Sequence, residues 1–479
     1  MTLHDIATPG TFPVPDRAGP APGLLSAAML ATGARLLAAE DPDLAELLDA
    51  ELRAQTDTLA SVAHASLAHP SVLAAAGSVL SNVTAEGYPG ARYHPGAECF
   101  DEVERLAARR ARGVFGACYA NVQPHSCSSA NQAVLFSLLA PGDTVLGMHL
   151  DAGGHLTHGA AASVTGRHFE AVHYGVDAAG LIDYSQVAEL ARRHRPRLIV
   201  AGASAYPRKI DYRQFREIAD EVDAYLLADI SHIAGLVAAG LHPSPVDVAH
   251  VTTTSTYKQL GGPRGGLILS GQEHDRPGPG GQRTLAAVLD RGVFPRAQGT
   301  PNAAAIAAKA RALALVDTPQ FRIWARRIVA DAQALAAALS RRGYRVLTGG
   351  TDNHMVLVHV GARGLTGAVA ENALRACGIL ANRNRIPADT KPPTVGSGLR
   401  FGTNILAQRG LQPGDMEQCA VLVDQVLSAV DVVDDTRYRL AQAVRDRVRA
   451  EVTEVCRRFP VADYLEAYPS RLLVDAELP

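Results

Sequence analysis

The chain has 479 residues, 47% of them hydrophobic and 20% charged, so it can bury a large core and is long enough for more than one domain. A formal net charge of −2 and the lack of any long basic run argue against a nucleic-acid partner. The six cysteines form no C-x-x-C pair, and we interpret them as reduced thiols of a cytoplasmic protein.

The patterns at the start of the chain indicate structure more than chemistry. Residues 1–23 are rich in proline and lack the basic and apolar regions of a signal peptide, so we expect a disordered arm there. Leucines at helical spacing predict amphipathic helices over 24–62, within an N-terminal helical segment that extends to 85. No run approaches the roughly 18 apolar residues of a membrane-spanning helix. We therefore expect a soluble protein with no membrane partner.

Two loops follow in which small and polar residues gather. The stretch Glu86-Gly-Tyr-Pro-Gly-Ala-Arg-Tyr-His-Pro-Gly96 is typical of a loop that carries function, although a tight structural turn is the alternative. After a predicted helix over 100–115, Ser126-Cys127-Ser128 precedes an apolar helix over 132–139. Hydroxyls and free N–H groups at a helix start can bind a phosphate, but a plain serine N-cap would have the same sequence.

The next motif contains two histidines. After a predicted strand over 144–148, Gly153-Gly154-His155-Leu-Thr-His158-Gly159 places His155 and His158 three residues apart. Such spacing suits metal ligands, but no third ligand stands nearby in the sequence, and we expect no metal. Stacking of the His155 imidazole on a flat cofactor is the interpretation that we favour.

Strands and helices then alternate. Strands predicted over 198–201 and 224–228, with a helix over 213–222 between them, indicate a mostly parallel sheet with helices on both faces. Ligands bind such sheets at the carboxyl ends of the strands, where Asp229 stands. Asp229 could keep a pyridine nitrogen protonated, or could be a buried structural acid.

The most informative stretch is Val251-Thr-Thr-Thr-Ser-Thr-Tyr-Lys258-Gln-Leu-Gly-Gly-Pro-Arg-Gly-Gly266. A lysine among small hydroxyl residues and glycines suits an amine that reaches an anionic cofactor, for which pyridoxal phosphate is the natural candidate. A strand ending in a threonine-rich turn, with Lys258 in solvent, is the alternative.

The remaining pattern predicts a second, smaller region. Helices over 303–316 and 321–341 lead to strands over 344–347 and 355–359 and a helix over 366–377. Arg400, between glycines in a β-run, can grip a carboxylate with two hydrogen bonds. We predict a large domain over 86–317 and a small C-terminal α/β domain over 318–479.

Taken together, six collinear stretches between about residues 70 and 460 resemble the serine hydroxymethyltransferase family of pyridoxal-phosphate enzymes. They are Ala85-Glu-Gly-Tyr-Pro-Gly, Ala120-Asn-Val-Gln-Pro-His-Ser, Gly153-Gly-His-Leu-Thr-His-Gly, Thr254-Ser-Thr-Tyr-Lys258, Gly262-Pro-Arg-Gly-Gly and Gly349-Gly-Thr-Asp-Asn-His. The resemblance implies an α/β protein of fold type I, with a mostly parallel, seven-stranded sheet in the large domain and a smaller α/β C-terminal domain.

The resemblance also implies roles for single residues. Lys258 would carry pyridoxal 5'-phosphate, Asp229 would partner its ring nitrogen, and His155 would stack on the ring. The remaining cofactor contacts would come from Ser126, Cys127, Ser128, Ser204, His232, Thr254, Gly299 and Thr300. Arg400 would bind the substrate carboxylate. Glu86, expected from a neighbouring subunit, would handle the proton of the substrate hydroxyl, which implies a homodimer with shared active sites or a tetramer.

Departures from the family's pattern concern the substrate. They include His64, where a serine is expected, Thr84, where a tyrosine is expected, and His94-Pro95 after Tyr93, where Tyr-Gly is usual. Asn353 and Gly153-Gly154 still match the folate-facing pattern. Three hypotheses follow for a protein that acts on a small-molecule amino acid with an aldehyde or tetrahydrofolate. They are a hydroxymethyltransferase, with α-methylserine as a candidate substrate; a folate-independent threonine transaldolase; and a catalytically silent paralogue. Intact Lys258, Asp229, His155 and Arg400 argue against the last.

Overall fold

The computed structural model describes residues 23–461, and the chain divides after Ala50 into two units, Met1–Ala50 and Glu51–Pro479. Residues 1–22 of the predicted arm therefore lie outside the described residues. The first unit holds helix α1 (Leu24–Glu40) and the start of α2 (Pro42–Asp57), where leucine spacing predicted helices. No helix within residues 23–461 combines the length and the apolar composition needed to cross a membrane.

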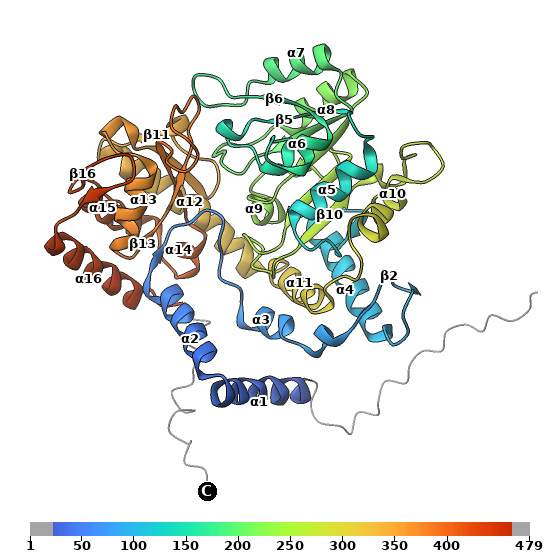
Figure 1. Cartoon of the computed structure of the whole chain (residues 1–479), viewed down its shortest axis with the longest axis horizontal. Helices are drawn as coiled ribbons and strands as arrows, with labels where there is room; N and C mark the ends of the chain where they lie inside the picture. Colours follow the sequence, from blue (N-terminus) through green and yellow to red (C-terminus); the bar gives the residue numbers. More distant parts are fainter. Residues whose placement is uncertain (1–22, 462–479) are drawn as a thin grey trace, which may run out of the picture. The chain divides into compact units, whose positions relative to one another are not determined.

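The main feature of the second unit is a seven-stranded sheet (Figure 1). Its strands follow the order β4-β10-β9-β8-β7-β5-β6, in which every pair from β9 to β6 is parallel and β10 is antiparallel to both neighbours. The bounds are β4 (Tyr119–Asn121), β5 (Thr144–Met148), β6 (Glu170–Tyr174), β7 (Leu198–Gly202), β8 (Tyr225–Asp229), β9 (Val251–Ser255) and β10 (Gly266–Ser270). The prediction of a mostly parallel sheet is confirmed.

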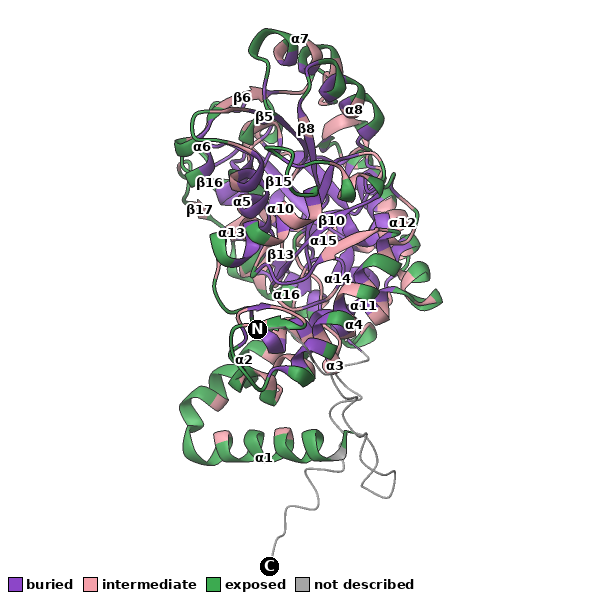
Figure 2. Ribbon diagram, turned by 90° about the vertical axis from the view of Figure 1, so that its right-hand side faces the viewer, coloured by how far each residue is buried: buried purple, intermediate pink, exposed green. Residues whose placement is uncertain are grey.

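Helices cover both faces of this sheet because successive strand residues point to opposite sides. Leu226 and Ala228 pack in a cluster with α4, α7, α8 and α11, whereas Leu227 between them packs with α5 and α10. The strands are accordingly mostly buried in Figure 2. The helices of this region are α3 (Pro70–Ala76), α4 (Glu98–Phe115), α5 (Cys127–Leu138), α6 (Val164–His168), α7 (Tyr184–His194), α8 (Tyr212–Glu221), α9 (Ala234–Ala238), α10 (Leu285–Arg291) and α11 (Ala303–Val316).

A second, antiparallel sheet follows the order β11-β12-β15-β14. One of its faces packs on α12, α13, α15 and α16 through Leu399 and Phe401, so the alternation of β15 turns Arg400 to the other face. The bounds are β11 (Arg345–Val346), β12 (Met355–His359), β14 (Asn382–Asn384), β15 (Gly398–Gly402), α12 (Pro319–Arg341), α13 (Gly367–Ala376), α14 (Asn404–Gln408), α15 (Met416–Leu427) and α16 (Gln442–Arg458).

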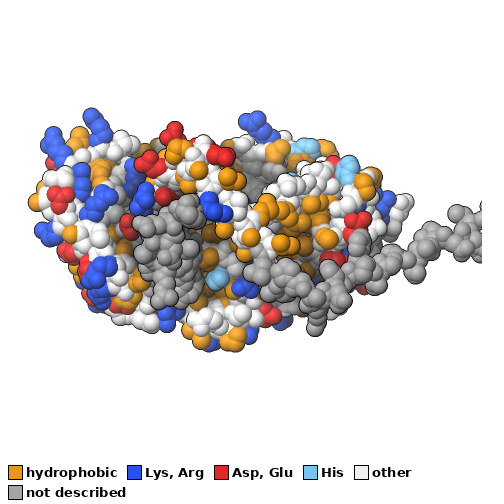
Figure 3. Space-filling model, turned by 90° about the horizontal axis from the view of Figure 1, so that it is seen from below, with side chains coloured by type: hydrophobic (Ala, Val, Ile, Leu, Met, Phe, Trp, Pro, Cys, Tyr) orange, Lys and Arg blue, Asp and Glu red, His pale blue; other side chains and the backbone are white. Residues whose placement is uncertain are grey.

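Short strand pairs complete the described chain. β1 (Leu59–Ala60) pairs with β13 (Ile379–Leu380), β2 (Gly87–Tyr88) with β3 (Ala91–Arg92), and β16 (Asp431–Val432) with β17 (Tyr438–Arg439). The domain division predicted at residue 317 falls between α11 and α12 and stays a prediction. On the face in Figure 3, basic side chains lie among acidic ones, as a net charge near zero would suggest.

Candidate active site

Many of the predicted site residues converge at the carboxyl edge of the parallel strands. Ser204 follows β7, Asp229 ends β8 and Lys258 follows β9. Parallel neighbours end at the same edge, so the loops after them meet there. A cavity of about 150 Å³ at this edge is lined by eight of the predicted residues: Ser126, Cys127, Ser128, His155, Ser204, Asp229, His232 and Lys258.

Asp229 is held as a buried anion. Its Oδ2 accepts hydrogen bonds from Asn131 Nδ2 at 2.8 Å and His158 Nε2 at 3.2 Å, and its Oδ1 accepts one from the N–H of Ser231 at 3.0 Å. Burial alone would raise the pKa of Asp229. The hydrogen bond and charge of His158, with smaller effects of His155 and Ser231, outweigh burial and hold that pKa below its usual range.

Three side-chain contacts to Asp229 were not predicted from the sequence: those of Cys127, Asn131 and His158. Cys127 was expected at the cofactor, but its Sγ also lies 3.6 Å from Asp229 Oδ1. Burial raises the pKa of Cys127, so the thiol stays protonated and can donate a hydrogen bond to the carboxylate. Asn131 stands four residues after Cys127 on α5, a helical spacing that could have suggested a shared face. The contact between His158 and Asp229 spans 71 residues and had no local signal.

The amine of Lys258 lies in the same cavity without a hydrogen bond to any residue in 23–461. The side chain is buried, and Nζ lies 5.9 Å from the centre of the Tyr257 ring. Burial lowers the pKa of Lys258 to about 8, although the charge of Asp229 opposes the shift. The alternative of a solvent-exposed Lys258 is therefore wrong.

Thr254 was expected at the cofactor, but it does not line the cavity. Its side chain is fully buried and its hydroxyl donates to the Ser255 carbonyl at 3.0 Å. The next residue, Ser255, lines the cavity instead. Side chains of a strand alternate between its two faces, so Thr254 points away from the cavity when its neighbour Ser255 points toward it.

One wall of the cavity is the N-terminus of α5. Ser126 caps this helix: its Oγ accepts from the N–H of Ser129 at 3.0 Å, so the N-cap interpretation holds. The N–H groups of Cys127 and Ser128 and the Ser128 hydroxyl make no hydrogen bond within residues 23–461, and an anion could bind there. Arg264, which the sequence reasoning missed, lines the same cavity and lies 4.3 Å from the Tyr257 ring centre.

The two histidines of the glycine-rich motif lie beside Asp229. Possible metal-ligand atoms of His155, His158 and Asp229 all lie within 4.8 Å of one another, so the fold brings in a third candidate ligand that the neighbouring sequence lacks. Asp229 Oδ2 already accepts hydrogen bonds from Asn131 and His158, however, and a metal ion would have to replace them. Burial lowers the pKa of His155 to about 4, which leaves a neutral ring against the cavity.

Arg400 connects the two sheets. From β15 its Nη1 donates to the Ser204 carbonyl, its Nε donates to Asn382 Oδ1 at 3.1 Å, and its Nη2 lies 3.4 Å from His64 Nδ1. Burial, followed by the positive charges of Arg400 and Lys258, lowers the pKa of His64 to about 4. A neutral imidazole thus accepts from the guanidinium, which keeps its charge with a pKa that burial lowers to about 10.

Close packing holds His64 in this place. A Cβ added to Gly402 would lie 2.3 Å from Ala63 Cα, so the backbone before His64 runs directly against β15. Ser61 Oγ also donates to the Gly402 carbonyl at 2.9 Å. The position of His64 relative to Arg400 is therefore set by main-chain contacts.

His232 completes the histidines around the cavity. Its ring is stacked on that of His354, with centroids 6.3 Å apart, and its Nδ1 has no partner within residues 23–461. Burial, then the charge of Lys258, lowers the pKa of His232 well below its usual value. A buried, neutral, unpaired nitrogen at a polar cavity is an available hydrogen-bonding group.

Five other predicted residues form a second group, and none of them lines the cavity: Glu86, Tyr93, His94, Gly299 and Thr300. His94 Nε2 lies 3.7 Å from Glu86 Oε2, and a Cβ on Gly299 would lie 3.1 Å from Glu86 Oε1. Thr300 Oγ1 accepts from the N–H of Ala85 at 2.9 Å. Tyr93 is 74% exposed.

Asn353, predicted to bind the substrate, does not line the cavity that holds Lys258. Its side chain is fully buried, its Nδ2 donates to the Tyr206 carbonyl at 3.0 Å, and its Oδ1 accepts from the N–H of Met355 at 3.0 Å. Both ends of the amide are therefore used by the fold.

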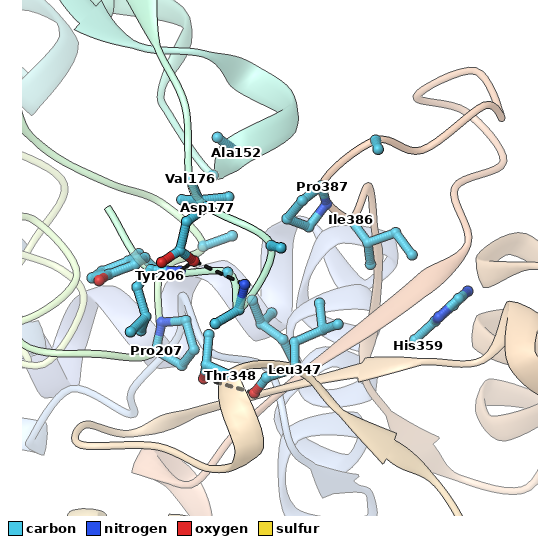
Figure 4. Close-up of a pocket in the computed structure, with 18 of the residues that line it drawn as sticks. Ala152, Val176, Asp177, Tyr206, Pro207, Leu347, Thr348, His359, Ile386 and Pro387 are labelled. Carbon is cyan, nitrogen blue, oxygen red and sulfur yellow. Dashed lines mark hydrogen bonds between the residues drawn. The ribbon is translucent and has the colours of Figure 1, made fainter. Parts of the chain in front are cut away.

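A larger cavity of about 660 Å³ lies between loops that lead from the two sheets (Figure 4). Val176, Tyr206, Leu347 and Ile386 are among its lining residues. Its lining includes Gly153, from the glycine pair that matches the folate-facing pattern, but none of the residues predicted to bind the cofactor. Size alone therefore does not identify the active site.

Comparisons with known proteins agree with this geometry. The family model described as serine hydroxymethyltransferase matches residues 37–423. A serine hydroxymethyltransferase of Alkalilimnicola ehrlichii is 49% identical over 426 residues, which cover 89% of this chain and 97% of that protein. One from a Synechococcus species is 47% identical over 444 residues, which cover 90% of this chain and 98% of that protein.

Proposed function

Since this chain belongs to the serine hydroxymethyltransferase family, we propose that it makes or breaks the Cα–Cβ bond of a β-hydroxy-α-amino acid by hydroxymethyl transfer. Enzymes of this family use pyridoxal phosphate, with tetrahydrofolate as the second substrate. One observation carries the proposal most: the unpaired, buried amine of Lys258 shares a small polar cavity with the buried anion of Asp229.

The residues around the cavity fit pyridoxal phosphate. The N-terminus of α5, Ser128 and Arg264 offer donors and positive charge for the phosphate, and Lys258 offers a reactive amine. The unpaired His232 Nδ1 offers a polar contact. Bound there, the cofactor would supply an electron sink for the bond broken at Cα.

The protein's own groups would orient the substrate. Arg400 keeps its charge and presents a planar fork of donors, which suits a carboxylate. It now donates to the Ser204 carbonyl, so a carboxylate would replace or share that bond. Asp229, kept anionic by its hydrogen bonds, would hold a proton on a ring nitrogen facing it.

The proton of the substrate hydroxyl requires another base, and Glu86 is our candidate. Its carboxylate is partly exposed in the single chain and does not line the cavity. We propose that Glu86, Tyr93 and His94 of one subunit serve the cavity of its partner in a homodimer, with Gly299 and Thr300 in the same loop contact.

A second candidate is a folate-independent transaldolase, which two contacts favour. His64 lies beside Arg400, our candidate for binding the substrate carboxylate, and His94 lies beside Glu86, our candidate base. Both imidazoles could therefore change which amino acid and which acceptor the site takes. Pro95, next to His94, fixes the backbone and removes a donor. We expect weaker tetrahydrofolate binding than in an ordinary member of the family, and folate-independent cleavage of a substrate larger than serine.

The test uses the purified protein loaded with pyridoxal phosphate. Serine, threonine and α-methylserine are supplied with and without tetrahydrofolate, and products are identified by mass spectrometry. Turnover of α-methylserine or serine only with folate supports hydroxymethyl transfer, and aldehyde release without folate supports the transaldolase. Lys258→Ala should lose cofactor absorbance and turnover, whereas the exposed control Lys209→Ala should keep both. A Lys258→Ala protein with normal turnover would contradict the proposal.

A further inference from the structure

A second buried lysine, Lys309, lies on α11 and takes no part in the chemistry described so far. It is 2% exposed, and its Nζ donates to three backbone carbonyls: Val122 at 2.7 Å, Pro124 at 2.9 Å and Gly266 at 3.1 Å. Burial lowers the pKa of Lys309 to about 7, and the charge of Glu104, which is itself bonded to Arg92 and Gln123, opposes the shift. The three donated hydrogen bonds use all three N–H groups of the ammonium form. Lys309 is therefore surrounded by carbonyl oxygens rather than paired with a carboxylate.

The three carbonyls come from two segments that border the candidate active site. Val122 and Pro124 belong to the loop that enters the N-terminus of α5 at Ser126, and Gly266 begins β10 after the turn that carries Arg264. The N–H of Gly266 also donates to the Pro124 carbonyl at 2.9 Å. The ammonium thus joins both segments at a single point.

Two glycines make this arrangement sterically allowed. A Cβ at Gly265 would lie 2.2 Å from Lys309 Cε, and a Cβ at Gly266 would lie 2.4 Å from the Ser126 carbonyl oxygen. The glycine pair at the end of the lysine motif therefore gives Lys309 access to its three acceptors. It also lets β10 approach the helix N-terminus where a phosphate would bind.

Converging carbonyl oxygens are the surroundings in which proteins replace the hydration shell of a monovalent cation. We propose that Lys309 is a positioning residue whose ammonium acts as a built-in monovalent cation, fixing the loop 122–126 and hence the N-terminus of α5. The consequence for cofactor affinity rests on the function proposed above, whereas the effect on the loop does not.

The experiment compares the full-length wild type with Lys309→Ala, Lys309→Met and Lys309→Arg. Alanine leaves a void that faces three carbonyls, methionine fills the void without charge, and arginine keeps the charge. Each cofactor-free protein is titrated with pyridoxal phosphate in tetramethylammonium, lithium, potassium or ammonium chloride at one ionic strength. Amide hydrogen exchange of residues 122–128 is measured in the same salts without cofactor.

We expect Lys309→Ala to bind the cofactor about tenfold or more weakly in tetramethylammonium and to exchange faster over the loop, because one buried charge joins both segments. Potassium or ammonium should restore both properties in Lys309→Ala but not in Lys309→Met, and the wild type should not respond to the salt. If Lys309→Ala does not fold, the test rests on Lys309→Met, which is similar in size and should exchange its amide hydrogens over residues 122–128 faster than the wild type.

The two proposals fail in different ways. A wild type that binds no pyridoxal phosphate overturns the proposed function. The role of Lys309 is then tested by amide hydrogen exchange of residues 122–128 alone, compared between the wild type and the variants. A wild type that binds the cofactor, with Lys309→Met equal to it in affinity and loop exchange, overturns the role of Lys309. Weak binding of Lys309→Ala that no cation restores also overturns it, because the residue would then act by volume.

Discussion

Asp229 gathers donors from three parts of the chain, and each makes a different contribution. Asn131 and Cys127 approach from α5, His158 from the glycine-rich motif, and the Ser231 N–H from the turn after β8. The charge itself is what a protonated ring nitrogen would require. The surrounding donors keep that charge in place at low solvent exposure.

Asp229→Asn should separate charge from shape. The amide has nearly the same size but cannot balance a protonated nitrogen, so we expect kcat to fall about 100-fold or more, which corresponds to roughly 2.7 kcal/mol. Cys127→Ala removes one weak donor and leaves the carboxylate, so its kcat should change about threefold at most. Steady-state kinetics with thermal unfolding as a folding control measure both. Equal losses in the two variants would show that shape, and not charge, matters.

The pKa of Lys258, which burial lowers to about 8, predicts how cofactor loading depends on pH. Only the neutral amine can react, so loading of the cofactor-free protein should speed up as pH rises through about 8 and then level off. An ordinary lysine would keep accelerating to about pH 10. Stopped-flow absorbance at several pH values tests this, with the cofactor's own titration subtracted by use of a free amine. Acceleration that continues above pH 9 would contradict a lowered pKa.

At the scale of single elements, α5 has two roles at its first turn. Ser126 caps the helix through Ser129, and the next N–H groups face no protein partner in the described chain. A helix of 12 residues with a closed capping box has its N-terminus fixed without a ligand. The cap and the anion site are thus compatible.

Ser126→Ala should weaken both roles. Losing an N-cap hydroxyl costs about 1 kcal/mol of stability, and cofactor affinity should fall as well because the same turn would bind the phosphate. Thr318→Ala is a matched control, since Thr318 caps α12 through Phe321 in another part of the fold. We expect similar losses in thermal stability but a loss of affinity only in Ser126→Ala. Equal affinities would place the phosphate elsewhere.

Helix α12 contains a buried acid, Asp331. Neither of its carboxylate oxygens has a hydrogen-bond partner within residues 23–461. Burial raises the pKa of Asp331 to about 7 from its ordinary 3.8. Between these values the folded protein holds a proton that the unfolded chain releases, so stability should fall as pH rises from about 4 to about 7. Asp331→Asn should raise the melting temperature at pH 8 and leave it nearly unchanged at pH 4. A pH-independent difference would show that Asp331 is not protonated on folding.

The elements also show which inferences a sequence permits. Runs of apolar residues bounded by turns predicted β5 and β12 with their observed limits, because burial and turn chemistry are both local. Thr254 and Asn353 were predicted from their motifs, and neither lines the cavity that holds Lys258. Their motifs match, but side-chain direction depends on strand register and on hydrogen bonds that only the folded chain supplies. The contact of His158 with Asp229 likewise depends on two distant loops meeting.

At the scale of the whole protein, the predicted residues fall into two groups that one chain does not bring together. Lys258 and Asp229 line the cavity, whereas Glu86 and His94 contact each other outside it. Sharing between subunits is the arrangement that would unite the groups. It makes a quantitative prediction.

Lys258→Ala and Glu86→Gln should each be inactive alone and should complement each other when subunits are exchanged. Random mixing gives about half heterodimers, each with one intact site of two, and so about a quarter of wild-type activity. Activity is measured after mild unfolding and refolding of the mixture, with each variant refolded alone as the control. No recovery, in a mixture shown by mass spectrometry to contain heterodimers, would place Glu86 in the cavity of its own chain.

The contact between Gly402 and Ala63 has a practical consequence for redesigning specificity. Any side chain at position 402 would push the backbone of Ala63 away, and with it the imidazole that faces Arg400. A directed-evolution library should therefore vary position 64 while keeping positions 63 and 402 fixed. In such a library each new side chain meets an undisplaced guanidinium, and a change in substrate preference can be attributed to that side chain alone.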